Sequence, residues 1–244
     1  MKRISIAGLA LGMLLLGSMV TPSIADTLWY NGDYDQTLNR YVSNQISDAL
    51  NARTYDDFVV PAGGWTINTL YSNNIVNTST STITEAYWEI RQGVSAGNGG
   101  TLLLSSTSLA SLAATDRYLD GSDYNNPEMK VAVTGLDLSL AAGTYWLCVT
   151  PYVPGGEGAV SNTVTRGENA TGFNSGNGLF CSNASNPEIL YVDGNFLFGF
   201  ESGIDYSMGI EGTVGSSVPI PPSILLLASA LLAMSAHGFW VRER

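Results

Sequence analysis

Between residues 26 and 215 the chain shows no sustained helical repeat of apolar residues. Instead, short runs in which apolar and polar residues alternate lie between clusters of Gly, Asn, Ser and Pro. Residues 204–210 are an example, with Ile204, Tyr206, Met208 and Ile210 at every second position. Alternation with a period of two is the pattern of a strand that buries one face. Many short strands between turn residues predict an all-β fold, an antiparallel β-sandwich of jelly-roll type.

The alternating runs place the expected strands as follows: Asp57–Val60, Trp65–Leu70, Thr84–Ile90, Thr101–Leu104, Met129–Thr134, Leu136–Leu140, Thr144–Val149, Leu179–Cys181, Phe196–Phe200 and Ile204–Ile210. Ala141-Ala142-Gly143, between two of these runs, predicts a hairpin. Residues 38–52 differ, because several apolar residues there share one helical face. This stretch could form either a short helix or an irregular loop.

The first 25 residues have the features of a secretory signal peptide. Lys2 and Arg3 precede an apolar stretch over residues 4–20, and small residues ending at Ala25 occupy the positions that signal peptidase recognises. We expect cleavage between Ala25 and Asp26. The alternative is an N-terminal membrane anchor, since the apolar stretch is long for a signal peptide.

Residues 224–241 form an apolar run that predicts a membrane helix. As a helix these residues would be roughly 27 Å long, enough to cross a bilayer core. Arg242 and Arg244 follow, and such basic flanks stay in the cytoplasm, so everything upstream is expected outside. The chain therefore divides into a signal peptide, an exported domain over 26–211, a linker over 212–217 and a C-terminal segment over 218–244.

Removing both ends leaves a strongly acidic chain. Residues 26–217 hold six basic and twenty acidic residues, a net charge of −14. An anionic surface of this kind repels anionic polymers unless cations bridge them. We therefore expect no nucleic-acid partner.

The C-terminal segment combines a proline-rich signature, one apolar helix and a basic end. The residues of the signature and the end are Val218-Pro219-Ile220-Pro221-Pro222 and Arg242-Glu243-Arg244. This order resembles the PEP-CTERM sorting signal of Gram-negative bacteria, with Ile220 where Glu is usual. The resemblance implies a tether in the inner membrane, cleavage by an exosortase, which is a membrane cysteine transpeptidase, and delivery to the cell surface or extracellular matrix. The alternative is an ordinary single-pass anchor behind a Pro-rich stalk.

Two further motifs resemble the framework of exported PEP-CTERM β-sandwich proteins. They are Asp56-Asp57-Phe58-Val59-Val60-Pro61-Ala62-Gly63-Gly64-Trp65 and Ala142-Gly143-Thr144-Tyr145-Trp146. The resemblance attaches no activity to these residues. We expect Gly63 and Gly64 to turn the chain, and Trp65 and Trp146 to fill the core.

The exported part offers little catalytic chemistry. The single histidine, His237, lies in the predicted membrane helix, which excludes Ser-His-Asp triads, Cys-His dyads and His-based zinc sites. The glycine-rich stretch 97–100 lies between strands and is typical of a turn, not of a phosphate loop. Two carboxylates suffice for a glycoside hydrolase, but Asp56 and Asp57 are neighbours on a strand and point to opposite faces. We therefore expect no enzyme, with a two-carboxylate hydrolase as the less favoured alternative.

Two acidic loops offer oxygen atoms at alternate positions, as calcium ligands do. They are Asn31-Gly32-Asp33-Tyr34-Asp35 and Asp120-Gly121-Ser122-Asp123-Tyr124-Asn125-Asn126. Neither has the spacing of an EF-hand, and Asp, Asn and Gly are first of all turn residues. We expect no cofactor, with a structural calcium ion as the alternative.

Cys148 and Cys181 are the two cysteines of the chain. An even pair in an exported protein favours a disulfide, and two separate buried thiols are the alternative.

Aromatic residues suggest a second function for the exported domain. Tyr34, Tyr124 and Tyr152 lie in polar, Gly-rich or Pro-rich loops, where tyrosines can stack on sugar rings, whereas Trp65, Trp88 and Trp146 lie in strands. The favoured function is that of a non-enzymatic exported protein of the cell surface or biofilm matrix. A lectin-like module for exopolysaccharide is the alternative.

Overall fold

The computed structural model describes residues 25–48, 50–77, 82–119, 123–154, 160–172, 175–182, 191–193 and 203–215, without the side chains of 123–125. Its strands are β1 (Asp26–Tyr30), β2 (Tyr41–Ser43), β3 (Gln45–Ile46), β4 (Asn51–Val60), β5 (Trp65–Val76), β6 (Glu85–Gln92), β7 (Thr101–Leu109), β8 (Ser111–Leu119), β9 (Asp123–Leu140), β10 (Gly143–Tyr152), β11 (Val160–Thr165), β12 (Leu179–Ser182), β13 (Val192–Asp193), β14 (Asp205–Tyr206) and β15 (Met208–Val214). The elements within these ranges are all strands, so the predicted all-β class is confirmed.

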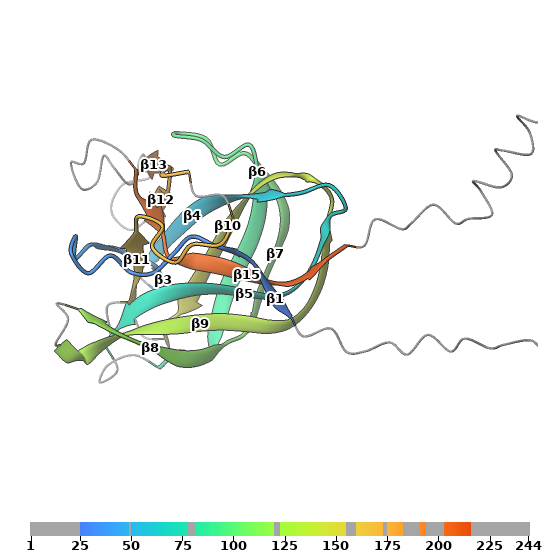
Figure 1. The fold of residues 1–244 in the computed structure, drawn as a ribbon. Coiled ribbons are helices and arrows are strands. Elements are labelled where there is room, and N and C mark those ends of the chain that lie inside the picture. Colours follow the sequence, from blue (N-terminus) through green and yellow to red (C-terminus); the bar gives the residue numbers. More distant parts are fainter. Residues whose placement is uncertain are drawn as a thin grey trace, which may run out of the picture.

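The strands form two sheets that face each other (Figure 1). The first sheet has β5 near its centre, with β9 and then β8 on one side and with β15, β1 and β11 on the other; β2 and β14 join β11. The second sheet has the order β13-β12-β4-β3-β10-β6-β7, with β4 and β10 also paired directly. Between these strands all pairings are antiparallel except that of β10 with β3. This arrangement is a β-sandwich, as the alternating runs predicted.

The core lies between the sheets and is centred on Phe58 of β4, which has no exposed surface. Its ring lies 5.9 Å from Trp65, 5.7 Å from Tyr145 and 5.5 Å from Trp29. Phe58, Trp65 and Tyr145 come from the two framework motifs, so these motifs supply the aromatic centre of the core. Aromatic contacts of this type add about 0.5–1.5 kcal/mol each beyond burial of area.

The two framework motifs also turn the chain from one sheet to the other. The residues between β4 and β5 connect the second sheet to the first, and Ala141-Ala142 connect β9 of the first sheet to β10 of the second. The predicted hairpin around Ala141 is therefore wrong, because β9 pairs with β5 whereas β10 pairs with β4 and β6. Local turn chemistry is the same in a hairpin and in a corner between sheets, so sequence alone did not separate them.

Both corners meet at one end of the sandwich, which we call the corner pole. A shallow groove there is lined by Gly63, Gly64, Trp65, Thr66, Ser139, Leu140, Ala141, Ala142 and Gly215. Gly64 has a φ of +75°, and a Cβ atom at this position would lie 2.5 Å from the carbonyl oxygen of Leu140. The close approach of the two corners therefore requires a glycine.

The stretch over residues 38–52 is neither a helix nor an irregular loop. It contains the end of a turn over residues 36–39, the short strands β2 and β3, and the start of β4. Val42 and Gln45 are buried, and β2 pairs with β11 while β3 pairs with β4. Pairing with these longer strands overrides a weak helical pattern.

The two ends of the described fold lie together at the corner pole. Asp26 pairs with Gly212 across β1 and β15, and the Gly215 amide donates to the carbonyl oxygen of Gly64 over 2.8 Å. Strand β15 continues to Val214, so residues 212–214 of the predicted linker belong to the sheet. In the part of the chain that the structure describes, no helix is long and apolar enough to cross a membrane.

Candidate functional site on the outer face of the second sheet

A group of polar, aromatic and thiol side chains lies on the outer face of the second sheet. The register places Glu89 of β6 beside Cys148 of β10, and Arg53 of β4 beside Cys181 of β12. Since side chains in register share a face, alternate residues of four strands meet there. We call this group, which is centred on Glu89, the arginine–glutamate cluster.

Glu89 is the centre of the cluster and has no exposed surface. The Tyr55 hydroxyl donates a hydrogen bond to Glu89 Oε1, and the Tyr87 hydroxyl donates to Oε2 over 2.9 Å. Arg91 Nε and Arg53 Nη1 lie 3.1 and 3.6 Å from Oε1. Four groups thus surround one carboxylate, which compensates for its removal from water.

The two arginines are held by aromatic rings and by backbone and side-chain acceptors. The Arg53 guanidinium lies 4.3 Å from the centre of the Tyr87 ring, and Arg53 Nε donates to Asn51 Oδ1 over 2.7 Å. The Arg91 guanidinium lies 5.9 Å from the Tyr191 ring, and its Nη1 donates to Gly99 O over 2.7 Å. Both arginine side chains are about one-fifth exposed, at 20% and 17%. With two cations and one carboxylate, the cluster presents excess positive charge toward solvent on an acidic protein.

An apolar cluster lies beside these charges. It contains Tyr55, Val94, Trp146, Cys148, Leu179 and Tyr191, with Cys181 against it. Trp146 is buried as predicted, but in this outer cluster and not between the sheets, whereas Trp65 and Trp88 belong to the main core. Burial raises the pKa of the Tyr55 hydroxyl far above its usual value, and the nearby Cys148 and Glu89 add to the shift, so Tyr55 stays a hydrogen-bond donor.

The predicted disulfide is not formed in the structure. Cys148 and Cys181 are both free thiols, the first buried and the second partly buried. Strand β4 lies between β10 and β12, which places the two residues about 10 Å apart at ordinary strand spacing, beyond the reach of a disulfide. Burial, and then Glu89, raise the pKa of the Cys148 thiol to about 12, and burial also raises that of Cys181. Neither thiol has the lowered pKa of a reactive cysteine.

A second buried group of carboxyls lies at the side of the core. Asp56 and Asp205, which have 0% and 1% exposed surface, are joined by a hydrogen bond between their carboxyl groups. The Tyr206 amide donates to Asp56 Oδ2 over 2.6 Å, and two amides of residues 176 and 177 donate to Asp205. Burial and the neighbouring Asp205 raise the pKa of Asp56 well above its usual range, so this pair keeps a proton to higher pH than an exposed aspartate does.

The side chain of Asp57 has a hydrogen-bond partner different from those of Asp56, while the Asp57 amide donates to Asp56 Oδ1 over 3.0 Å. Asp57 Oδ1 accepts a hydrogen bond of 2.6 Å from the Ser175 hydroxyl. Asp56 pairs with Asp205, which lies about 150 residues further along the chain.

The first of the two predicted calcium loops uses its carboxylates internally. Asp33 Oδ1 lies 2.9 Å from Arg117 Nη1 and accepts a hydrogen bond from the Tyr30 hydroxyl, and Asp35 accepts hydrogen bonds from the Thr37 and Leu38 amides. Across the described residues, no three acidic, cysteine or histidine side chains gather as a metal site would require. Residues 120–122 of the second loop and the side chains of 123–125 lie outside the described residues.

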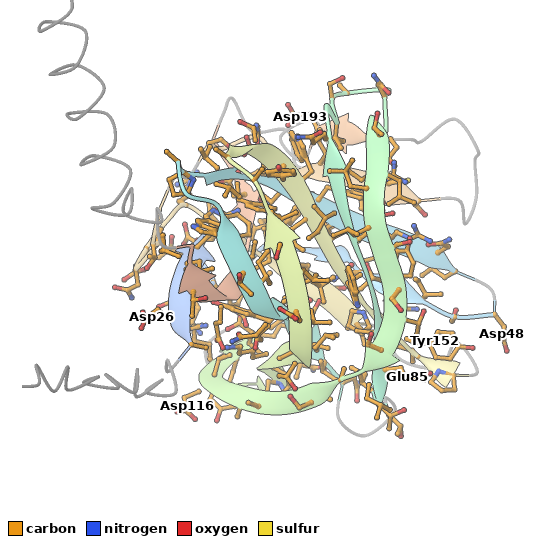
Figure 2. The ribbon with its side chains drawn as sticks, turned by 90° about the vertical axis from the view of Figure 1, so that its right-hand side faces the viewer. Asp26, Asp48, Glu85, Asp116, Tyr152 and Asp193 are labelled. Atoms are coloured by element: carbon orange, nitrogen blue, oxygen red, sulfur yellow. The ribbon has the colours of Figure 1, made fainter. Side chains whose placement is uncertain are left out.

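The loop tyrosines are not all available to a sugar. Tyr34 is buried, with 2% exposed surface, and its hydroxyl donates to Asn39 Oδ1 over 2.6 Å. Tyr152 is partly exposed at the end of β10 beside Glu85, as Figure 2 shows. The side chain of Tyr124 lies outside the described residues.

The structure describes two of the residues predicted to direct export. Ala25 precedes the fold and Asp26 is the first residue of β1. The predicted sorting residues Val218, Pro219, Pro221, Arg242 and Arg244, together with the predicted membrane helix, lie outside the described ranges.

Sequence analysis missed the arginine–glutamate cluster and Asp205. Arg53, Glu89 and Arg91 are polar positions of alternating strands, and such positions are usually exposed to solvent. The i, i+2 spacing of Tyr87, Glu89 and Arg91 does place them on one face, but which face another layer covers depends on the strand order. Comparisons with protein-family models, with curated proteins and with solved structures found no match for this chain.

Proposed function

We propose that this protein is an exported, non-enzymatic β-sandwich of the cell surface or extracellular matrix of a Gram-negative bacterium. A signal peptide ending at Ala25 starts its export, and an exosortase-type transpeptidase recognises the PEP-CTERM-like segment over residues 218–244. The protein is tethered to the inner membrane by residues 224–241 until it is cut. The jelly-roll connectivity of the sandwich belongs to the same proposal.

The observation that carries the proposal is the position of the two ends of the fold. β1 begins at Asp26, the first residue after the predicted signal cleavage, and β15 ends at Val214, shortly before the sorting signature. Both ends lie at the corner pole, because Asp26 pairs with Gly212. One end of the sandwich therefore faces the membrane while the rest of the surface stays available.

The tether between fold and signature is short. The Gly215 amide is bonded to Gly64, and the signature begins three residues later at Val218. Three residues, even fully extended, span about 10 Å. The corner pole would thus lie close to the transpeptidase, and the small residues that line its groove offer little steric hindrance.

The buried acids support a non-enzymatic role for the carboxyl pair. Asp56 and Asp205 lie inside the fold and accept hydrogen bonds from backbone amides. A substrate could reach these carboxyl groups only by displacing residues of the core. The alternative is a lectin-like module for exopolysaccharide. Tyr34 cannot contact a sugar because it is buried, which weakens this alternative, whereas the positive outer face formed by Arg53 and Arg91 favours binding of an anionic polysaccharide.

Mass spectrometry of the protein recovered from the cell surface tests the proposal. We expect a mature chain that begins at Asp26 and ends near Val218. Replacing Pro219 and Pro221 together by Ala should leave an uncut form in the inner membrane. Proline restricts the backbone to extended conformations, which the transpeptidase is proposed to recognise, whereas alanine also allows a helix. The exposed Pro154→Ala serves as the matched control and should be processed normally. A surface-recovered peptide that still contains Phe239-Trp240-Val241 would show a permanent anchor and contradict the proposal.

A further inference from the structure

Strand β7 is the last strand of the second sheet and presents a long open edge. It pairs with β6 from Leu109 opposite Glu85 to Thr101 opposite Gln92. Among the described strands none pairs with its other edge. An open edge offers a row of amide and carbonyl groups that can pair with another chain.

The other edge strands carry features that hinder such pairing. β8 contains Asp116, which has a φ of +61°, and its pairing with β9 shifts register twice. β1 is five residues long and contains a register shift, and its last residue, Tyr30, forms a bridge with Thr171. β13 and β14 have two residues each. Short length, bulges and charges usually protect sheet edges from pairing with another chain. Of the described edge strands, β7 has the fewest of these features.

The surface around β7 is also uncharged and apolar. Residues 92–115 contain no Asp, Glu, Lys or Arg, although the exported part of the chain carries a net charge of −14 from six basic and twenty acidic residues. Leu102, Leu103 and Leu109 are 45%, 40% and 78% exposed, and Leu112 at the start of β8 is 36% exposed. Exposed apolar residues that gather on one flank mark a surface for protein contact.

We propose that two copies of this chain associate through β7, antiparallel about a two-fold axis at Ser106. In this register Leu103 lies opposite the partner's Leu109, and Ser105 lies opposite the partner's Thr107. The bulge of β7 falls near Leu103, between the residues that pair with Ile90 and Arg91, so residues 104–109 stay regular. A two-fold interface of this type joins the two second sheets into one.

The distribution of charge favours a second copy of this chain as the partner of the β7 edge. A basic partner would be drawn to the acidic surface elsewhere on the molecule, and not to a flank without charge. A second copy is repelled by most of that acidic surface, but it can approach where both chains are neutral. The β7 edge meets this condition and also offers a matching set of leucines.

The test is the molar mass of the full chain, purified in mild detergent and measured by light scattering with the detergent mass subtracted. The wild-type chain should be a dimer. Leu103→Lys with Leu109→Lys should raise the dissociation constant at least about 100-fold, because two leucines per chain lose burial and four cations face one another. Val214→Lys, a change of the same kind at a 59% exposed position on β15 of the other sheet, should leave the dimer intact.

Cysteine cross-linking then checks the register. Ser106→Cys should give a dimer on a non-reducing gel after mild oxidation, whereas Ser111→Cys, on the exposed start of β8, should not. A monomeric wild-type chain, a dimer that survives the two lysines, or equal cross-linking by both cysteine variants would overturn the proposal. Unchanged melting temperatures exclude loss of the fold as the cause. Because the measured quantity is mass, the result does not depend on where the cell sends the protein.

Discussion

Glu89 is a single carboxyl group with no exposed surface, and its surroundings explain how the fold accommodates it. Two hydroxyls donate to it and two guanidinium groups lie against it. The arginines are in turn held over tyrosine rings. Removing the carboxylate charge would leave two partly buried cations facing each other without an anion between them.

We therefore expect Glu89→Gln to lower the free energy of unfolding by about 3 kcal/mol, the low end for breaking a buried ion pair because both arginines reach solvent. Urea unfolding followed by tryptophan fluorescence measures the change. The exposed Glu168→Gln is the control and should stay within about 0.5 kcal/mol of the wild type. Equal stability of both variants would show that the cluster contributes nothing to folding.

At the scale of elements, the corner between β4 and β5 depends on backbone contact. Gly64 and Gly93 both have positive φ, at +75° and +67°, but a Cβ on Gly64 would meet Leu140 O, whereas one on Gly93 would meet nothing within 4 Å. Gly93→Ala should cost about 1 kcal/mol from backbone strain alone. Gly64→Ala should cost at least about 2 kcal/mol more, because the two corners must move apart. Thermal unfolding of the two variants compares them directly, and similar losses would refute close packing of the corners.

Sequence patterns predicted strands better than connections. The alternating residues of 204–210 and the framework motifs gave the strands that form the core, since burial of one face leaves a clear period. They did not predict β11, whose six residues Val160–Thr165 are all buried although four of them are Ser, Asn or Thr, so that no alternation is visible. Nor did they show that Ala141-Ala142 form a corner between sheets. Which sheet a strand joins is decided by partners far away in the chain.

The candidate site was hidden for the same reason. Arg53, Glu89 and Cys181 come from three strands, and no spacing along the chain links them. Asp56 pairs with Asp205 across the fold in the same way. Only the order of strands brings these residues together.

At the scale of the whole molecule, the Asp56–Asp205 pair links stability to pH. Burial is the largest cause of the raised pKa of both carboxyls. The folded chain therefore keeps a proton that the unfolded chain releases above about pH 4. The stability that this proton supplies is complete below that pH and is lost as the pH rises through the folded-state pKa.

Melting temperatures measured from pH 4 to pH 8 should consequently fall toward the alkaline end. Asp56→Asn, which is neutral at every pH, should flatten this slope, whereas the exposed Asp137→Asn should keep it. A slope that is the same in both variants would show that the pair does not control the pH dependence.

The placement of β15 between β1 and β5 sets the order in which the molecule can assemble. Synthesis runs from the N-terminus, so β1 emerges first, yet the strand it pairs with is the last of the described fold. Trp29 on β1 must wait for Ile210, its partner across β15, before it is enclosed. Pairings between residues so distant in the chain form slowly. The sandwich therefore closes as its final residues arrive, and a nascent chain that stops before Met208 leaves both β1 and β5 without the strand that joins them.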